Sequence, residues 1–376
     1  MPADLPASAF TISDDQREFR SAVRAFLDHH CPEAALRRAI ETDVGYDQAT
    51  WRAMSDQLKL PGLLIPEEYG GEGFGFGELA LVLEEMGAAL LPGPYFSSAV
   101  LATSVLLWCA PDSAKSRYLP GIASGHTIAT VALTERSGHW DVPTIETRAV
   151  HRLGSWTLQG AKYFVPDGGS ADLVLVVAQT ETGIGLFAVD DTTSISRRTQ
   201  SSLDPTRRTA VIEFDATPAI RVDDGSTEET LSRALAAAVA GLACEQVGGA
   251  QRCLDMAVDY AKVRHQFGRP IGSFQAIRHE CANLMLEIEC ARGAAQYAAS
   301  SVDVFADRMV SAAAIAKAYC SETYLRAAAA NIQLHGGIGF TWEHPAHFYY
   351  KRAQSAAMLL GDADYHRKVL ADRIGL

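Results

Sequence analysis

The sequence predicts an α+β fold with an N-terminal α-helical domain over residues 1–126, a middle β domain of sandwich or barrel type over 127–224, and a C-terminal four-helix bundle over 225–376. Two observations predict this order. Both ends of the chain show the apolar period of helices, whereas about a hundred residues in the middle form short apolar and β-branched runs between turn residues. The 376 residues also suffice for two or three domains with a large core.

The N-terminal domain opens with a clear helix signal. Ser13 and Gln16 have the spacing of a capping box, and an apolar stripe follows as far as Leu27, which predicts an amphipathic helix. Proline and glycine clusters divide the rest of the domain into shorter helical segments. The further helices predicted in this domain are Asp47–Leu58, Phe76–Ala89, Ser97–Cys109 and Ser113–Leu119.

The other two domains are predicted from a change in period. Turn residues separate the runs of the middle domain, and after Asp223–Gly225 the sequence returns to long helical periods rich in alanine, which lets helices approach closely. The predicted strands are Thr144–Val150, Ser155–Leu158, Leu173–Ala178, Gly185–Val189 and Ala210–Phe214. The predicted bundle helices are Glu228–Val263, Phe274–Ser300, Ala306–Leu334 and Pro345–Leu360.

The composition excludes several classes of function. The chain has 33 Lys+Arg against 45 Asp+Glu, a net charge of −12, and such an acidic surface repels nucleic acid, so we expect no nucleic-acid partner. No apolar run reaches the about 18 residues of a membrane span, and the N-terminus lacks signal-peptide character, so we expect a cytoplasmic protein without membrane insertion. The seven cysteines form no C-x-x-C pair, and His344 with His347 lacks further ligands, so we expect no metal site.

Three motifs carry information about chemistry. The first is 264–271 (RHQFGRPI), which Phe274 and Gln275 follow; the second is 333–340 (QLHGGIGF), and the third is 132–135 (ALTE). Together they offer a cation, a flat aromatic ring, amide side chains and adjacent glycines. These are the groups that hold a dinucleotide, because its pyrophosphate needs positive charge and amide donors, and glycine lets the backbone come close.

With 64–71 (LIPEEYGG) and 118–134 (YLPGIASGHTIATVALT), these motifs resemble the acyl-CoA dehydrogenase family over nearly the whole chain, in the α–β–α order of that family. The closing stretch 351–367 resembles the smaller subunits of bacterial heteromeric members. The resemblance implies an FAD-dependent oxidoreductase of lipid metabolism that takes an acyl-CoA substrate to a trans-2-enoyl-CoA. It also implies electron transfer to an electron-transfer flavoprotein.

The resemblance assigns cofactor residues to the C-terminal bundle and to the middle domain. The family's residues matching Arg264, Phe267 and Gln275 reach across a subunit interface to a neighbour's FAD, and those matching Gln333, Gly336 and Gly337 touch the same dinucleotide. Binding then requires a homo- or hetero-oligomer, a dimer or a tetramer. The plainer alternatives are that the arginine complements a helix dipole and that the glycines cap a helix. In the middle domain, the cofactor-binding candidates by resemblance are Leu133, Thr134, Phe164 and Val165.

The middle-domain motifs depart from the family pattern. A Gly-Ser-Asp element after Thr-Glu is replaced by 139–141 (HWD), and a Trp-Ile-Thr-Asn element by 164–167 (FVPD). Phe164 still offers a ring to cover a flavin. Pro166 has neither a hydroxyl nor an amide hydrogen, so a hydrogen bond to the flavin edge from that position is lost.

The catalytic base also departs from the family pattern. In many members a glutamate removes the α-proton of the thioester, and that position here is Leu360; the base position of other members falls on Ala238. Two helical turns after Ala238 stands Glu245, the only charge between Arg233 and Arg252, and we name it as the candidate base. The alternative is a buried anchor paired with Arg264 or Arg252. Asp362 is a weaker candidate that suits a solvated turn.

Three functional hypotheses follow from these matches. The first is an active acyl-CoA dehydrogenase, and the second is a non-catalytic partner subunit that completes the FAD site of a heteromeric enzyme. An acyl-CoA oxidase is a third and weaker one, because the chain is short for that group.

The resemblance also implies a main-chain contact with the substrate. In the family the main-chain amide at the glutamate position polarises the thioester carbonyl, and Leu360 offers that amide equally well.

Overall fold

The computed structural model describes residues 12–376 apart from 141–143, 226 and 305–306. The chain forms two compact units. The first contains the described residues of Met1–Ala35 together with Phe76–Leu91 and Val239–Leu376, and the second contains Leu36–Gly75 and Pro92–Ala238. This grouping divides the predicted N-terminal domain between the units, so the predicted boundaries at 126 and 224 stay a prediction.

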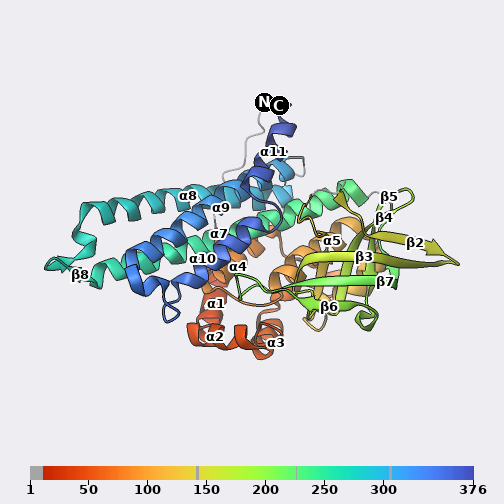
Figure 1. The fold of residues 1–376 in the computed structure, drawn as a ribbon, viewed down its shortest axis with the longest axis horizontal. Coiled ribbons are helices and arrows are strands. Elements are labelled where there is room, and N and C mark those ends of the chain that lie inside the picture. The colour runs from red at the N-terminus through yellow and green to blue at the C-terminus, as the bar shows by residue number, and fades with distance from the viewer. Residues whose placement is uncertain (1–11, 141–143, 226, 305–306) are drawn as a thin grey trace. The chain divides into compact units, whose positions relative to one another are not determined.

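The first unit is helical, and Figure 1 shows α8, α9 and α10 running beside α7 as a bundle. The N-terminal helix begins with the predicted capping box, since the Ser13 and Gln16 side chains each bond the other residue's backbone N–H. The helices are α1 (Asp14–His30), α4 (Phe76–Ala89), α7 (Thr227–Val263, which enters this unit at Val239), α8 (Gln275–Val304), α9 (Met309–His335), α10 (Ala346–Met358) and α11 (Ala363–Arg373). Short elements complete it: β8 (His265–Gln266), β9 (Arg269–Pro270), η7 (Ile271–Ser273) and η8 (Gly336–Phe340).

Glycines let α4 and α7 touch through their backbones. A Cβ at Gly87 of α4 would overlap the carbonyl oxygen of Glu245, and a Cβ at Gly248 of α7 would overlap that of Glu84. Neither position has space for any side chain, so both glycines are required by packing rather than by backbone conformation. This contact fixes the register of α7, the helix from which most candidate site residues are positioned.

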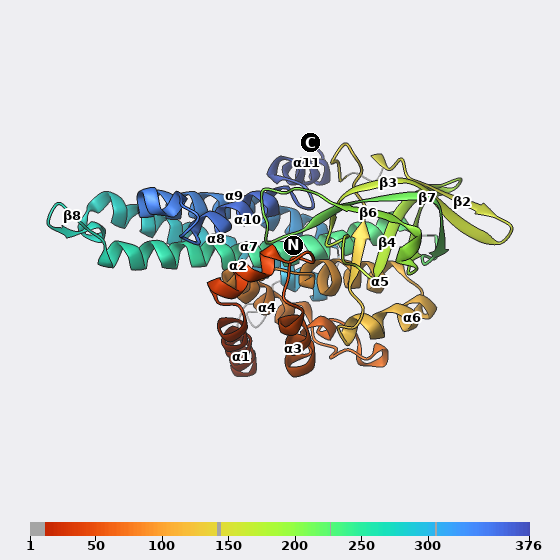
Figure 2. The same cartoon turned by 60° about the horizontal axis from the view of Figure 1, so that its bottom comes forward.

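The second unit contains a sheet whose strands close on themselves. The ladder runs β4–β2–β3–β7–β5 and returns to β4, while β1 pairs with β4 and β6 with β7, which makes the barrel-like domain that the sequence predicts. Figure 2 labels β2, β3, β4, β6 and β7 in this sheet. The strands are β1 (Ala129–Ala132), β2 (Arg148–Arg152), β3 (Ser155–Pro166), β4 (Leu173–Thr180), β5 (Gly183–Val189), β6 (Ser196–Thr199) and β7 (Thr209–Arg221).

Helices of the second unit pack on this sheet. The predicted helix Ser97–Cys109 instead begins as a π-helix, η4 (Tyr95–Ala102), and continues as α5 (Thr103–Cys109). The π turn is held by Thr103, whose backbone N–H bonds the carbonyl of Ser98 five residues earlier, and the Ser98 hydroxyl accepts the backbone N–H of Ala129 in β1. The remaining elements are α2 (Glu33–Glu41, whose first residues belong to the first unit), α3 (Gln48–Leu58), η2 (Leu60–Gly62), η3 (Glu67–Tyr69), α6 (Asp112–Ala123) and η6 (Thr192–Ser194).

We expect the substitution Gly248→Ala to lower the free energy of unfolding by at least about 2 kcal/mol, because the new methyl group must push α4 away from α7. Gly293→Ala in α8 is the matched control. The space around that glycine is open, so alanine should raise the free energy of unfolding by about 1 kcal/mol through its helix propensity. Urea denaturation measures both, and effects of the same sign would contradict the backbone contact.

Candidate functional site at the end of the helical bundle

Three helix ends meet at one end of the first unit. The α7 helix ends at Val263, α8 begins at Gln275 and α9 ends at His335, and α8 packs along α9. The Tyr260 ring of α7 stacks on the His335 ring of α9, with centroids 4.3 Å apart. The motifs 264–271 and 333–340 therefore lie together, at the end where Figure 1 labels β8.

A tight hairpin presents Phe267 to solvent. The strands β8 and β9 pair His265 with Pro270, and the two turn residues Phe267 and Gly268 both have positive φ, 54° and 79°. That is the pattern of a type I′ turn, in which phenylalanine is strained because its side chain disfavours the left-handed region. The Phe267 side chain is 92% exposed. Strain and exposure at one aromatic residue mark it as a candidate for binding.

The polar side chains of the two motifs also face outward. Arg264, Gln275 and Gln333 are exposed, and within the described part of the chain the Arg264 guanidinium has no hydrogen bond or ion pair. The three side chains are therefore not turned into the core of their own chain. An exposed cation at the end of α7 still complements the helix dipole, so that alternative stays compatible with its position.

The two glycines of the second motif, Gly336 and Gly337, meet different structural requirements. Gly336 ends α9 with φ 65° and ψ −142°, a conformation that suits glycine, so the capping interpretation applies to this residue. Gly337 has no left-handed backbone, and apart from its own local backbone and its two chain neighbours no atom of the described chain lies within 4 Å of the place its Cβ would take. Nothing within the described chain requires glycine at 337, whereas a ligand that approaches the backbone would.

The residues at this end fit an FAD dinucleotide. An unpaired guanidinium at Arg264 suits the pyrophosphate, the exposed Phe267 ring suits a flat base, and the amides of Gln275 and Gln333 offer donors and acceptors. The open backbone at Gly337 admits close approach. These residues come from one end of a single unit and are exposed there, which suits a cofactor held mainly by another chain.

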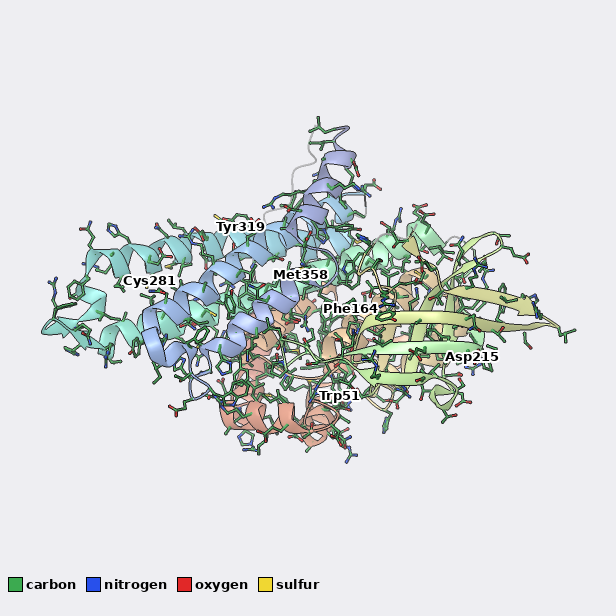
Figure 3. The ribbon with its side chains drawn as sticks, viewed as in Figure 1. Trp51, Phe164, Asp215, Cys281, Tyr319 and Met358 are labelled. Atoms are coloured by element: carbon green, nitrogen blue, oxygen red, sulfur yellow. The ribbon has the colours of Figure 1, made fainter. Side chains whose placement is uncertain are left out.

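The middle-domain candidates are mostly buried. Leu133, Thr134 and Val165 are at most 5% exposed, and the Thr134 hydroxyl donates to the carbonyl of Tyr163. The fold therefore already uses these three side chains. We still predict that the three residues contact a cofactor, but through their main-chain atoms. Phe164 is 43% exposed, and Figure 3 labels it at the end of β3.

A buried ion pair holds these segments together. Lys162 Nζ lies 2.8 Å from Glu135 Oε1 and donates to the Leu133 carbonyl at 2.9 Å. Burial lowers the pKa of Lys162 to about 8, and the neighbouring carboxylate opposes that shift. The pair fixes the Phe164 segment, where the backbone has φ 54° and its N–H is taken by Gln200 Oε1 at 2.9 Å. Of the replaced element 139–141, Asp141 lies outside the described residues.

Glu245, the candidate base, lies in a buried ion pair. Its Oε1 is 2.8 Å from Arg352 Nη1, and both side chains are at most 6% exposed. Arg352 also donates to the Leu91 carbonyl at 3.2 Å. The sequence had suggested Arg264 or Arg252 as the partner, and no local pattern pointed to Arg352, which lies on α10. A guanidinium stabilises the carboxylate anion and so makes it a weaker proton acceptor.

The segment after α10 contains polar contacts that the sequence did not reveal. Leu360 has φ 59°, and its carbonyl accepts a hydrogen bond from His366 Nε2 at 2.9 Å. The carbonyl of Gly361 accepts from Lys317 Nζ at 2.9 Å. Asp362, the weaker base candidate, caps α11 by accepting the backbone N–H of Tyr365 at 2.8 Å, so a structural role explains it.

The described residues contain no group of three or more His, Cys, Asp or Glu side chains that could hold a metal ion. Among the helices of the described residues, none is both long enough and apolar enough to cross a bilayer.

Comparison with known proteins gives consistent results along the chain. Models of the acyl-CoA dehydrogenase N-terminal, middle and C-terminal domains match residues 13–126, 130–217 and 229–375. The acyl-CoA dehydrogenase IpdE2 of Mycobacterium tuberculosis is 34% identical over 350 residues, which cover 93% of this chain and 94% of that protein.

Two solved structures share the fold. The steroid ACAD Tcur3481–Tcur3483, in a glycine-to-alanine variant, matches with TM-score 0.87 and 30% identity over 97% of this chain and 98% of that chain. The ChsE4–ChsE5 complex of Mycobacterium tuberculosis matches with TM-score 0.88 and 26% identity over 97% of this chain and 98% of that chain.

The burial of His366 makes the free energy of unfolding depend on pH. Burial, with the nearby charge of Lys317 adding to it, lowers the pKa of His366 to about 4, against about 6.5 for an exposed histidine. The unfolded chain therefore binds more protons between these values. We expect the free energy of unfolding to fall by on the order of 3 kcal/mol as the pH drops from 6.5 to 4.

The variant His366→Gln isolates this contribution, because its amide can still donate to the Leu360 carbonyl and does not titrate. Urea denaturation of both proteins at several pH values gives the two slopes. A wild-type slope equal to that of the variant across this window would contradict the assignment.

Proposed function

The chain belongs to the acyl-CoA dehydrogenase family, and from this premise we propose that it works in an oligomeric, FAD-dependent enzyme that converts an acyl-CoA to a trans-2-enoyl-CoA. The observation that supports this proposal is the exposed set at the end of the bundle, above all Arg264, Phe267 and Gln333. When bound, FAD supplies the acceptor for the β-hydride. The electrons then pass to an electron-transfer flavoprotein.

The net charge of the chain explains why the groups that bind an anionic dinucleotide must be gathered in one place. The chain carries a net charge of −12, so its surface as a whole disfavours an anionic dinucleotide. Arg264 has no intramolecular partner within the described residues, and its guanidinium can therefore neutralise a pyrophosphate without breaking an existing ion pair. Phe267 offers its face to the adenine, and the open backbone at Gly337 lets the dinucleotide approach. Since these groups point away from their own core, they serve the FAD of an adjoining chain, in a dimer or a tetramer.

This chain also supplies a donor for the thioester. Within the described residues the Leu360 N–H has no hydrogen-bond acceptor, although the residue is only 4% exposed. Removal of the α-proton places negative charge on the thioester oxygen, and an amide N–H held in place stabilises that charge. We assign this donation to Leu360, which replaces the family's glutamate side chain but keeps its main chain.

A second candidate function is the partner subunit of a heteromeric enzyme. The ion pair between Glu245 and Arg352 favours it, because it leaves this chain without an unpaired candidate base at the positions considered. The ChsE4–ChsE5 complex, with a fold match at TM-score 0.88, contains two named chains, which supports such an arrangement. In this case a second chain donates the base, and the present chain completes the FAD site.

We expect Gly337→Leu to lower FAD occupancy by at least about tenfold, because the new side chain fills space that the described chain leaves open. Gly293→Leu is the matched control, an equally open glycine on α8 away from the motifs. The measurement is the flavin absorbance per chain after dialysis, combined with the thermal stability of each variant. Unchanged flavin content in Gly337→Leu would contradict the bundle-end site.

The same preparation tests the reaction. Wild-type protein should be yellow and should reduce an electron-transfer flavoprotein when one of a panel of straight, branched, cyclic and steroid-derived acyl-CoA thioesters is added. If the chain alone is colourless and gains flavin and turnover only with a second polypeptide, the partner-subunit function is the correct one. Absence of turnover in both preparations would contradict the proposal.

We expect Glu245→Gln to leave turnover per bound flavin within about threefold of the wild type, because Arg352 already neutralises the carboxylate. The same change should lower the free energy of unfolding by about 3 kcal/mol, since it leaves a buried guanidinium without its anion. The double variant Glu245→Met with Arg352→Met should recover most of that loss. A fall in turnover of a thousandfold or more in folded Glu245→Gln protein would instead identify Glu245 as the base.

A further inference from the structure

Lys317 on α9 is a lysine with no exposed surface. Its Nζ donates to the Ala357 carbonyl and the Gly361 carbonyl, both at 2.9 Å, and to Ser321 Oγ at 3.1 Å. An ammonium has three N–H groups, and three acceptors surround this one. Burial of a cation is costly unless its hydrogen bonds are satisfied, so the arrangement calls for a specific reason.

The two carbonyls lie on either side of the strained residue Leu360, one in the last turn of α10 and one in the turn that follows. Figure 3 labels Met358, the last residue of α10, and directly after it the chain turns through Leu360 with φ 59° and Gly361 with φ 95°. A side chain at Gly361 would overlap the ring of Tyr365, so the turn is tightly packed. Leucine is rarely found in the left-handed region, and it persists there only where the surroundings hold it.

Side chains from two other helices hold this turn. Lys317 of α9 binds the Gly361 carbonyl, and His366 of α11 binds the Leu360 carbonyl at 2.9 Å. Because a carbonyl only accepts hydrogen bonds, His366 Nε2 is the donor there. Lys317 also holds the Ala357 carbonyl before the turn, so the segment that carries the Leu360 N–H is restrained on both sides.

The same network reaches α7. Gln246 Nε2 donates to Ser321 Oγ at 3.0 Å, and Ser321 accepts from Lys317. Both Gln246 and Ser321 are 1% exposed. A continuous buried chain of hydrogen bonds therefore joins α7 to the Leu360 turn. These are the two places at which different family members carry the base.

We propose that Lys317 is a positioning residue that aims the Leu360 main-chain N–H at the thioester carbonyl of the acyl-CoA. The inference rests on the proposed function and extends it by naming the residue that orients the donor. An apolar side chain would fill the same volume without the cost of burying a charge. The cation is retained because the carbonyl groups before and after Leu360 must be held at once.

The test compares Lys317→Met with wild-type protein that carries its FAD and any second chain it retains. Ser321→Ala is the matched control, because it removes one acceptor of the ammonium but leaves both carbonyl contacts. We expect kcat of Lys317→Met to fall by about tenfold to a hundredfold, with KM and flavin content changed by less than about twofold. Ser321→Ala should stay within about threefold of wild type.

A second measurement does not depend on electron transfer. A 3-thia-acyl-CoA has sulfur at the β position and no hydride to give, yet its α-protons exchange with D2O when the thioester carbonyl is polarised. We expect the exchange rate in Lys317→Met to fall by the same factor as kcat. An effect on fold alone would not slow exchange per folded, ligand-bound site.

The outcomes separate this inference from the proposed function. If kcat and the exchange rate of Lys317→Met both equal those of wild type, Lys317 is a structural anchor and the inference is wrong. If Lys317→Met does not fold, Lys317→Gln takes its place under the same criteria, because its side chain is one atom shorter and uncharged and so cannot reproduce both contacts of the ammonium at 2.9 Å. If wild-type protein, with or without a second chain, turns over no acyl-CoA, the proposed function fails and this inference fails with it.

Discussion

The close backbone contact between α4 and α7 determines how the candidate sites are arranged. Because Gly87 and Gly248 leave no space between the two helices, α7 has one register relative to α4. That register turns Glu245 toward Arg352 and Gln246 toward Ser321, and it brings Tyr260 against His335 at the far end. A single helix thus sets the buried ion pair, the network to the Leu360 turn and the position of the exposed motif.

Buried charges in this protein hold strained backbone in place. Lys317 binds the carbonyl groups around Leu360, and Lys162 with Glu135 ties the segment that carries Phe164, a second residue with positive φ. A cation bonded to several backbone carbonyl groups costs less to bury than one left unpaired, and it restricts the peptide planes that it contacts. Arg264 differs from these cations, because it is exposed and has no partner within the described chain. Exposure leaves its charge available to a ligand.

Much of the fold could be predicted from local pattern. The helix Phe76–Ala89 and the capping box at Ser13 follow from periodicity and spacing, and both are confirmed. The strands Ala129–Ala132 and Ser196–Thr199 were missed because four residues are too few to show a period. The helix predicted to reach Leu360 ends at Met358, because the two residues that follow leave the helical conformation.

The exposure of the candidate site residues was predictable from sequence motifs, whereas their distant contacts were not. The motif around Arg264 and Phe267 was predicted as a binding segment, and the structure places both residues at the surface. The partners Arg352 and Lys317 carry no local signal, since each lies tens of residues from the group that it contacts, and His366, six residues after Leu360, belongs to no recognised motif. Only the packing of α9, α10 and α11 brings them to the Leu360 turn and to Glu245.

The two groups of cofactor candidates differ in one physical respect. At the bundle end the side chains of Phe267, Gln275 and Gln333 extend away from their own chain. In the middle domain the hydroxyl of Thr134 and the amide of Phe164 already have partners within the fold. A group that must bind a ligand gains more when it starts without an internal hydrogen bond, because none has to be broken. The exposed groups at the bundle end are therefore freer to bind a dinucleotide than the paired groups of the middle domain, which supports the proposal that this chain completes a flavin site on a neighbour.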